Sequence, residues 1–266
     1  MTATDTVFSG SIPALYDLYL VPMLFAPYAA DLARRTALLH PQRILETAAG
    51  TGVVTAAIVA ALPEAELVAT DLNQAMLDVA AARITSPNVI FRQADAQALP
   101  FADASFDALV CQFGVMFLPD RIAAYREARR VLKPGGRFLF NAWDRIEENV
   151  VTAALAEALT AFFADNPPSF YARVPFGYHD KARIEADLRA AGFEHIEAET
   201  VAKRSRSESA RAAATGLCQG TPLRAEIEER GSLDDATEAA ALALSRLEGP
   251  GGLDAPMSAH VFSAGA

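Results

Sequence analysis

The segment from Arg43 to Gly52 constrains the fold of this chain more than any other. An apolar strand runs through Glu46 and small residues into Gly50 and Gly52. A helical pattern follows from about residue 53 to 61. Glycine tolerates a positive φ and leaves room for a ligand beside the backbone, so a strand that turns into a helix here predicts a nucleotide-binding corner.

Further strand-like segments follow this corner at regular intervals. Two of them end in an acid, at Asp71 and Asp95, and helical patterns lie between several of them. The segments cover residues 67–71, 89–95, 106–112 and 131–140. Several are continuous apolar runs, which is typical of parallel strands buried on both faces, so the sequence predicts an α/β fold.

Together these segments resemble the class I S-adenosylmethionine-dependent methyltransferases, and more closely the small-molecule enzymes related to the quinone-biosynthesis methyltransferases. The matching motifs span about residues 43–143 and are Glu46 to Gly52, Asp71, Asp95-Ala96, Phe106-Asp107 and Leu132 to Gly136. The chain departs from the family at Ala48-Ala49, where a glycine and another small residue are common. The resemblance implies a Rossmann-like, seven-stranded, mostly parallel sheet with helices on both faces.

The resemblance also implies S-adenosylmethionine as the cofactor and S-adenosylhomocysteine as its product. In the family, Glu46 helps to hold the methionyl end, Asp71 offers two acceptors to the ribose hydroxyls, and Asp95 accepts from the adenine amino group. The residues expected to bind the cofactor are Tyr16, Glu46, Ala48, Gly50, Thr51, Gly52, Asp71, Leu72, Met76, Asp95, Ala96, Gln112 and Phe113.

Structural roles would also account for many of these residues. Glu46 and Asp95 could cap turns, and Asp71 could cap the helix expected to begin near residue 74. Asp107 precedes its strand, far from the expected ligand edge, and is interpreted as structural. Ordinary core packing would explain Tyr16, Leu72, Met76 and Phe113.

No strong catalytic constellation is visible in the sequence. Displacement at a sulfonium methyl needs mainly proximity, alignment and exclusion of water, because the leaving group is already activated. A base is needed only for a protonated acceptor, and the weak candidates are Tyr178 and His179, which precede a helix expected at 181–191. Cys111 and Cys218 lack metal-ligand spacing, so no metal is expected.

Composition limits the partners of the chain. A net charge of −10 argues against nucleic acid, which requires clustered basic residues. Apolar runs are broken short of the roughly 18 residues that span a membrane, and Met1 to Asp5 shows no signal-peptide pattern. We therefore expect a cytoplasmic protein that acts on a small-molecule acceptor, with a homodimer left open.

The whole chain, 1–266, is expected to form a single methyltransferase domain. Residues 1–40 would be an N-terminal helical cap punctuated by prolines, 41–145 the cofactor-binding core, and 146–266 substrate-lid helices with the last strands. The lid segments carry aromatic residues suited to a small apolar or aromatic acceptor, although packing within the lid would look the same. These aromatic residues are Phe162, Phe163, Phe170, Tyr171, Phe176 and Tyr178.

An unusually long insertion separates the strand expected at 195–202 from the one expected at 258–263. It contains three helical patterns, at about 207–217, 222–230 and 233–247, and Ser205 with Glu208 has capping-box spacing. Connections longer than the fold needs are often lids or disordered segments, and the apolar content here favours a packed helical lid.

Two other functions remain compatible with the sequence. A nicotinamide-dependent oxidoreductase also has a glycine turn followed by an acid, but its usual Gly-x-Gly-x-x-Gly motif has a third glycine where this chain has Thr55. That function would also give no role to Glu46 and Asp95. A non-catalytic protein that binds S-adenosylmethionine would carry the same motifs.

Overall fold

The computed structural model describes residues 3–266. Met1 and Thr2 lie outside the described residues; they belong to the predicted N-terminal cap and to the segment that shows no signal-peptide pattern. Two compact units are each assembled from separate stretches of chain. The first unit comprises the chain up to Pro27, Trp143–Gly177 and Ala202–Ser258, and the second comprises Tyr28–Ala142, Tyr178–Val201 and Ala259–Ala266.

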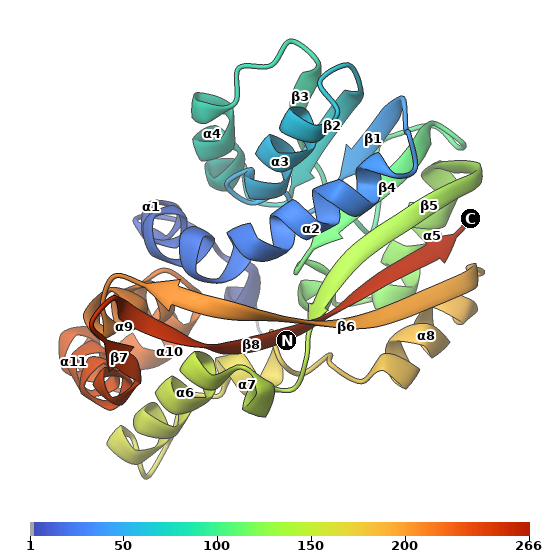
Figure 1. Cartoon of the computed structure of the whole chain (residues 1–266). Helices are drawn as coiled ribbons and strands as arrows, with labels where there is room; N and C mark the ends of the chain where they lie inside the picture. Colours follow the sequence, from blue (N-terminus) through green and yellow to red (C-terminus); the bar gives the residue numbers. More distant parts are fainter. Residues whose placement is uncertain (1–2) are drawn as a thin grey trace. The chain divides into compact units, whose positions relative to one another are not determined.

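Helices and strands alternate along the second unit as expected (Figure 1). The helical elements are η1 (Ala3–Thr6), α1 (Ile12–Leu15), η2 (Tyr16–Phe25), α2 (Ala26–Ala37), α3 (Val53–Ala61), α4 (Gln74–Arg83), η3 (Val115–Phe117), α5 (Arg121–Val131), η4 (Ile146–Glu148), α6 (Val150–Phe162), α7 (Phe170–Arg173), α8 (Lys181–Ala190), α9 (Ala210–Gln219), α10 (Leu223–Glu228), α11 (Leu233–Leu244) and η5 (Ser245–Leu247). The strands are β1 (Arg43–Glu46), β2 (Glu66–Asp71), β3 (Val89–Gln93), β4 (Phe106–Gln112), β5 (Leu132–Trp143), β6 (Glu194–Ser207), β7 (Glu248–Gly249) and β8 (Gly252–Gly265).

The strands form one sheet in the order β3-β2-β1-β4-β5-β8-β6, and the two-residue strand β7 pairs with β8. The β1 strand pairs in parallel with both β2 and β4, and β5 pairs in parallel with β4. The strand order therefore reverses between β1 and β4, and in open α/β sheets ligands bind at the carboxyl ends of the strands at such a reversal. The expected Rossmann-like, mostly parallel sheet is confirmed.

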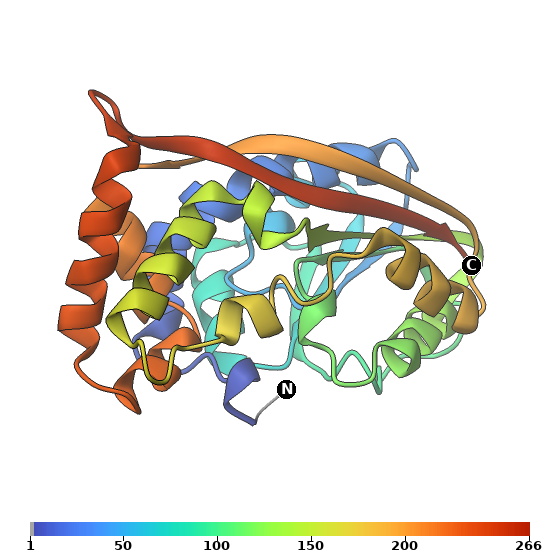
Figure 2. The same cartoon turned by 90° about the horizontal axis from the view of Figure 1, so that it is seen from below.

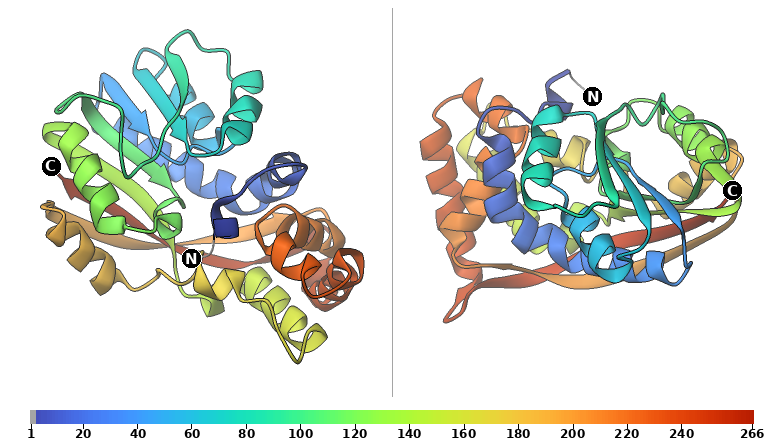
Figure 3. Two further views of the ribbon diagram at one scale, coloured as in Figure 1. Left: turned by 180° about the vertical axis from the view of Figure 1, so that it is seen from behind. Right: turned by 90° about the horizontal axis from the view of Figure 1, so that it is seen from above.

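Helices of the second unit cover the sheet on both faces (Figures 1 and 3). On one face, Leu32 of α2 and Ile58 of α3 belong to the same buried cluster as Val110 of β4. On the other face, the Tyr125 ring of α5 stacks on Phe140 of β5, with ring centroids 5.8 Å apart. The sheet is thus held between helical layers that leave its strand ends to the connecting loops.

The insertion after β6 is a packed set of helices within the first unit. Helix α11 packs against both α9 and α6 (Figure 2), and α9 also packs against η2. The contact between α9 and η2 is close, since a Cβ atom on Gly216 would lie 2.7 Å from the Cβ of Tyr19. The helical nature expected for this insertion is therefore observed.

The start of the insertion differs from the sequence prediction. The expected capping box of Ser205 and Glu208 is wrong, because β6 continues to Ser207 and buries Ser205. Helix α9 is instead capped by Ser209, whose hydroxyl accepts a hydrogen bond from the Ala212 amide at 3.0 Å. Cross-strand pairing of Arg204 with Asp254 of β8 accompanies the longer strand.

The N-terminal helix is also more continuous than the prolines suggested. Residues from Ile12 to Ala37 are helical throughout, and Pro22 lies inside the π-helical segment η2. Inside an α-helix a proline lacks the N–H donor and its ring clashes with the carbonyl four residues earlier, and the wider π-helical turn of η2 alters the hydrogen-bond pattern at this position. By length and composition alone this helix could cross a membrane, as the buried core helix of a soluble protein also could.

Candidate functional site

The loop after β1 is hydrogen-bonded to both β2 and β4 at the carboxyl edge of the sheet. The Thr47 amide donates to the Val110 carbonyl at 2.9 Å, and the Ala49 amide donates to the Thr70 carbonyl at 2.9 Å. These bonds hold the segment after Glu46 against both neighbouring strands. The predicted glycine corner is therefore a rigid loop at the point where the strand order reverses.

Two residues other than glycine adopt left-handed backbone conformations at this edge. Ala48, after β1, has φ 53°, and Phe113, after β4, has φ 52°. Such conformations cost free energy outside glycine and are concentrated at functional sites. The two loops also meet closely, because a Cβ atom on Gly114 would lie 2.4 Å from the Cβ of Ala48.

Gly52 allows α3 to begin against α4. It is the N-cap of α3 and has φ 83°. A Cβ atom there would lie 2.9 Å from the Cβ of Ala80 and 2.8 Å from the Cδ1 of Ile84, closer than real Cβ contacts. The second glycine of the motif is thus required by both backbone conformation and packing.

Asp71 ties the glycine loop to the loop after β2. One carboxylate oxygen accepts from the Gly50 amide at 2.9 Å, and the other accepts from the Asn73 amide at 2.8 Å. Burial raises the pKa of Asp71 and these amides partly offset the rise. Asn73, rather than Asp71, is the N-cap of α4, so the alternative role as a helix cap is not observed.

Glu46 is a buried carboxyl at the end of β1. One of its oxygens accepts a hydrogen bond from the Thr55 hydroxyl at 2.6 Å. Burial raises the pKa of Glu46 to about 8, the Thr55 hydrogen bond partly offsets the rise, and the charge of Asp71 adds to it. The group is therefore mostly protonated at neutral pH, and a cation beside it would favour its ionised form.

The remaining residues near the glycine loop differ in exposure. Thr51 is buried, and its hydroxyl has no hydrogen-bond partner among residues 3–266. The Met76 methyl group lies 3.6 Å from where a Cβ atom on Gly50 would be. Leu72 is 50% exposed, so it does not belong to the core.

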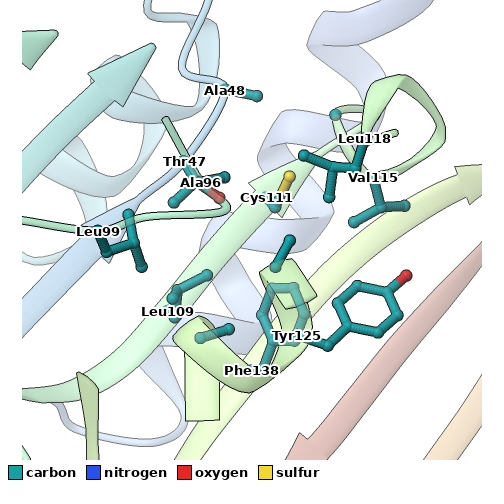
Figure 4. A pocket seen from close by; sticks show the side chains of 13 residues that line it. Thr47, Ala48, Ala96, Leu99, Leu109, Cys111, Val115, Leu118, Tyr125 and Phe138 are labelled. Carbon is teal, nitrogen blue, oxygen red and sulfur yellow. The ribbon is translucent and has the colours of Figure 1, made fainter. Parts of the chain in front are cut away.

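A small apolar cavity lies beneath this edge, between β4, β5 and α5 (Figure 4). Its volume is about 20 Å³, which is room for about one water molecule. Ala48, Ala96 and Gly114 line it together with Cys111, so it borders three of the predicted site loops. Burial raises the pKa of the Cys111 thiol to about 11, so the thiol is a neutral apolar group here, as expected.

Other predicted residues have additional structural roles or lie elsewhere. Asp95 is exposed and accepts from the Gln97 amide at 2.8 Å, which is the turn-capping role. Tyr16 belongs to the first unit, where its ring stacks on Phe25 with centroids 4.9 Å apart. The roles of Asp95 toward adenine and of Tyr16 toward the cofactor stay predictions.

The candidate bases gain little support from their surroundings. Tyr178 is buried, and its hydroxyl donates to the Asp187 carboxylate at 2.8 Å. The Tyr178 hydroxyl accepts from the Tyr125 hydroxyl at 3.3 Å. Burial raises the pKa of Tyr178, which opposes its ionisation. His179 is exposed. No group of three or more His, Cys, Asp or Glu in the described part of the chain could hold a metal ion.

Asn141 is a residue that the sequence analysis missed. It lies near the end of β5, directly beside Gln112 of β4 in the parallel register. Its side chain is fully buried, and neither its nitrogen nor its oxygen has a hydrogen-bond partner within residues 3–266. The available signal was a single polar residue inside the apolar run from Phe138 to Trp143.

Comparison with known proteins places this arrangement in a family. Residues 45–140 match the family model described as a methyltransferase domain. The chain is similar to a solved structure of the YcgJ protein of Bacillus subtilis, with 21% sequence identity and a TM-score of 0.59. The matched region spans 90% of this chain and 98% of the YcgJ chain. At that identity the likeness concerns the fold.

Two curated relatives are similar in sequence as well. The demethylmenaquinone methyltransferase of Clavibacter sepedonicus is 34% identical over 62% of this chain and 70% of its own length. The ubiquinone/menaquinone biosynthesis C-methyltransferase of Rubrivivax gelatinosus is 33% identical over 71% of this chain and 78% of its own length. With the glycine loop and the strand-end acids described above, these matches show that the chain belongs to the S-adenosylmethionine-dependent methyltransferase family.

Proposed function

We propose that this protein transfers a methyl group to a small, apolar or aromatic acceptor at the carboxyl edge of β1 and β4. S-adenosylmethionine, the cofactor of the family, supplies an activated methyl group on a sulfonium. The observation that carries the proposal is the placement of Glu46, Thr51 and Asp71 around one rigid glycine loop. The names of the relatives support a small acceptor made in quinone biosynthesis.

The residues at this edge fit such a cofactor. The unpartnered Thr51 hydroxyl is a buried polar group that can donate to or accept from a ligand. Asp71 Oδ2 accepts from the Gly50 amide, and Oδ1 accepts from the Asn73 amide and, at 3.5 Å, from the Asn73 side-chain nitrogen. A carboxylate oxygen can accept two hydrogen bonds, so Asp71 can bind two vicinal hydroxyls of a ribose by exchanging only the long contact with the Asn73 side chain, while both backbone amides stay bound.

Glu46 supplies a second interaction with a cationic ligand. Its raised pKa means that it is mostly neutral in the free protein and becomes ionised when a positive charge lies near it. The amino group of the methionyl end is such a charge. We therefore assign to Glu46 the binding of that amino group, coupled to loss of its own proton.

The two rival functions are less well supported. Thr55, which stands at the third glycine position of a dinucleotide fingerprint, donates its hydroxyl to Glu46 and so has a role in this site. A non-catalytic binding protein would share the site, but the two curated relatives reported above are named as methyltransferases. The whole chain from 1 to 266 is proposed to act as one methyltransferase, with α9, α10 and α11 as a lid over the acceptor.

The binding part of the proposal can be tested by thermal shift. S-adenosylhomocysteine should raise the melting temperature, by mass action worth about 2.7 kcal/mol at a hundredfold excess over the dissociation constant, whereas NAD and NADP should not. Native mass spectrometry should also detect a co-purified ligand of the homocysteine derivative's mass. A shift with a nicotinamide and none with S-adenosylhomocysteine would contradict the proposal.

A further inference from the structure

Helix α9 of the long insertion lies in the core of the first unit. Most of its residues are buried, and they cover most of the circumference of the helix. It packs against α10 and α11 of the insertion and also against α1 and η2 of the N-terminal segment. A helix that is buried nearly all round belongs to a core, so α9 cannot open as a separate flap without exposing the interior of its own unit.

The N-terminal helix approaches α9 at two glycines. A Cβ atom on Gly216 would lie 2.7 Å from the Cβ of Tyr19 and 3.0 Å from the Cδ2 of Leu20. A Cβ atom on Gly220, the residue that ends α9, would lie 3.1 Å from the backbone nitrogen of Tyr16. Rotating a side chain moves neither a Cβ atom nor a backbone nitrogen, so a larger residue at Gly216 must displace η2 relative to α9.

Polar contacts attach the segment before this helix to the first unit as well. The Arg224 guanidinium of α10 donates to the Ser11 hydroxyl at 2.8 Å. Asp5 is 2% exposed and accepts from Arg173 of α7 at 2.9 Å, and Arg173 also donates to Glu226 of α10 at 2.7 Å. A buried carboxylate that loses its partner is costly, so these contacts hold the N-terminal segment against α7 and α10.

Tyr16 lies between the polar contacts and the glycine contacts. It is the first residue of η2, and its side chain is half-buried. Its ring stacks on Phe25 and meets Phe8 edge to face, with centroids 6.0 Å apart. Both rings belong to the N-terminal segment, so the position of Tyr16 follows that of η2. The insertion, which fixes η2, thereby fixes Tyr16 within the first unit.

We propose that the insertion positions Tyr16 for the cofactor, with Gly216 as the positioning residue. The inference rests on the proposed function and on the cofactor role expected for Tyr16. The sequence predicts that the insertion serves the acceptor, whereas α9 and α10 also hold the helix that carries Tyr16. Binding couplings are reciprocal, so an acceptor that shifts α9 changes the affinity for the cofactor, and the cofactor changes the affinity for the acceptor by the same factor.

The test is a double-mutant cycle on the full chain. Calorimetry gives the S-adenosylhomocysteine affinity of the wild type, Gly216→Ala, Tyr16→Phe and the double variant. Gly216→Ala adds a methyl group that must displace η2, and Tyr16→Phe removes only a hydroxyl. Each single change should weaken binding about five- to tenfold, and the double variant should bind no more weakly than Tyr16→Phe. Losses that multiply in the double variant would mean that Gly216 does not act through Tyr16 and would overturn the inference.

Gly249→Ala is the matched control for the added methyl group. Gly249 also lies in the insertion, and a Cβ atom there would meet nothing within 4 Å. This variant should bind S-adenosylhomocysteine as the wild type does. An equal loss in Gly249→Ala and Gly216→Ala would show a general sensitivity of the insertion and would overturn the positioning role.

A second variant keeps the test decisive if Gly216→Ala does not fold. Arg224→Met removes the exposed contact with Ser11, five residues before Tyr16, and leaves the glycine contacts intact. It should weaken S-adenosylhomocysteine binding about two- to threefold when Tyr16 is present and leave the affinity of Tyr16→Phe unchanged. An equal effect in both backgrounds would contradict action through Tyr16.

Failure of the positioning role can be told apart from failure of the proposed function. Absence of S-adenosylhomocysteine binding by the wild type would contradict the proposed function itself. Binding by the wild type, with unchanged affinity in Tyr16→Phe or in a folded Gly216→Ala, would contradict the positioning role alone.

Discussion

Replacing Glu46 by glutamine tests the electrostatic state of the proposed site. Glutamine keeps an oxygen that can accept from the Thr55 hydroxyl, but it cannot ionise. In the wild type, burial raises the pKa of Glu46 from 4.5 to about 8. The folded chain therefore holds this proton to higher pH than the unfolded chain does.

The sign and size of the effect follow from linkage. Between about pH 4.5 and pH 8 the folded state binds more protons than the unfolded state, so the contribution of Glu46 to stability is full below that window and is lost as pH rises through it. The difference of about 3.5 pKa units corresponds to roughly 5 kcal/mol over the whole window, and to roughly 3 kcal/mol between about pH 5 and pH 8.

The assay is urea unfolding of the ligand-free wild type and Glu46→Gln at several pH values. The free energy of unfolding of the wild type should fall relative to that of the variant by roughly 3 kcal/mol from about pH 5 to pH 8. Carboxylates that do not interact with Glu46 titrate alike in both proteins and cancel in the difference, which leaves Glu46 and its electrostatic coupling to Asp71. Parallel curves for the two proteins would refute the argument that Glu46 is buried as a neutral acid.

Two further substitutions and the proton release on ligand binding should have measurable effects. Asp71→Asn should weaken S-adenosylhomocysteine binding by about 1.5–3 kcal/mol, roughly 10- to 100-fold, in calorimetry, and unchanged affinity in a folded variant would remove Asp71 from the site. At about pH 7, binding of S-adenosylhomocysteine to the wild type should release close to one proton from Glu46, so the calorimetric binding enthalpy should depend on the buffer. This dependence should be absent in Glu46→Gln. A binding enthalpy of the wild type that does not depend on the buffer would contradict the prediction. Gly52→Ala should lower the free energy of unfolding by at least about 1–2 kcal/mol, because φ is 83° and the new Cβ atom would meet Ala80, whereas wild-type stability would show that the loop can relax.

Much of the second unit was predictable because its signals are local. Several parallel strands are continuous apolar runs, and the helix expected at 181–191 is observed from Lys181 to Ala190, with Asp180 as its N-cap and Gly192 just after its end. Asp107 was correctly interpreted as structural: it accepts from the Arg43 amide at 2.8 Å and from Lys133 at 2.6 Å.

The features that sequence reasoning missed depend on contacts between distant residues. The extension of β6 through Ser205 depends on its partner β8, some 50 residues away along the chain, so local capping preference gave way to strand pairing. Asp71 accepts both the Gly50 amide and the Asn73 amide, and the first of these bonds forms only because the loop after β1 approaches the end of β2. Asn141 looked like one polar residue in a strand, and only the structure shows that its side chain is buried without a hydrogen-bond partner among residues 3–266.

Methyl transfer from S-adenosylmethionine carrying an isotopically labelled methyl group tests the central claim most directly. The purified protein is incubated with the labelled cofactor and the small-molecule fraction of a cell extract, and both products are followed by mass spectrometry. The account predicts formation of S-adenosylhomocysteine together with a labelled small molecule, and neither product with Asp71→Asn at cofactor concentrations far below its dissociation constant. A folded protein that binds the cofactor yet forms neither product from such extracts would contradict the assignment as a small-molecule methyltransferase.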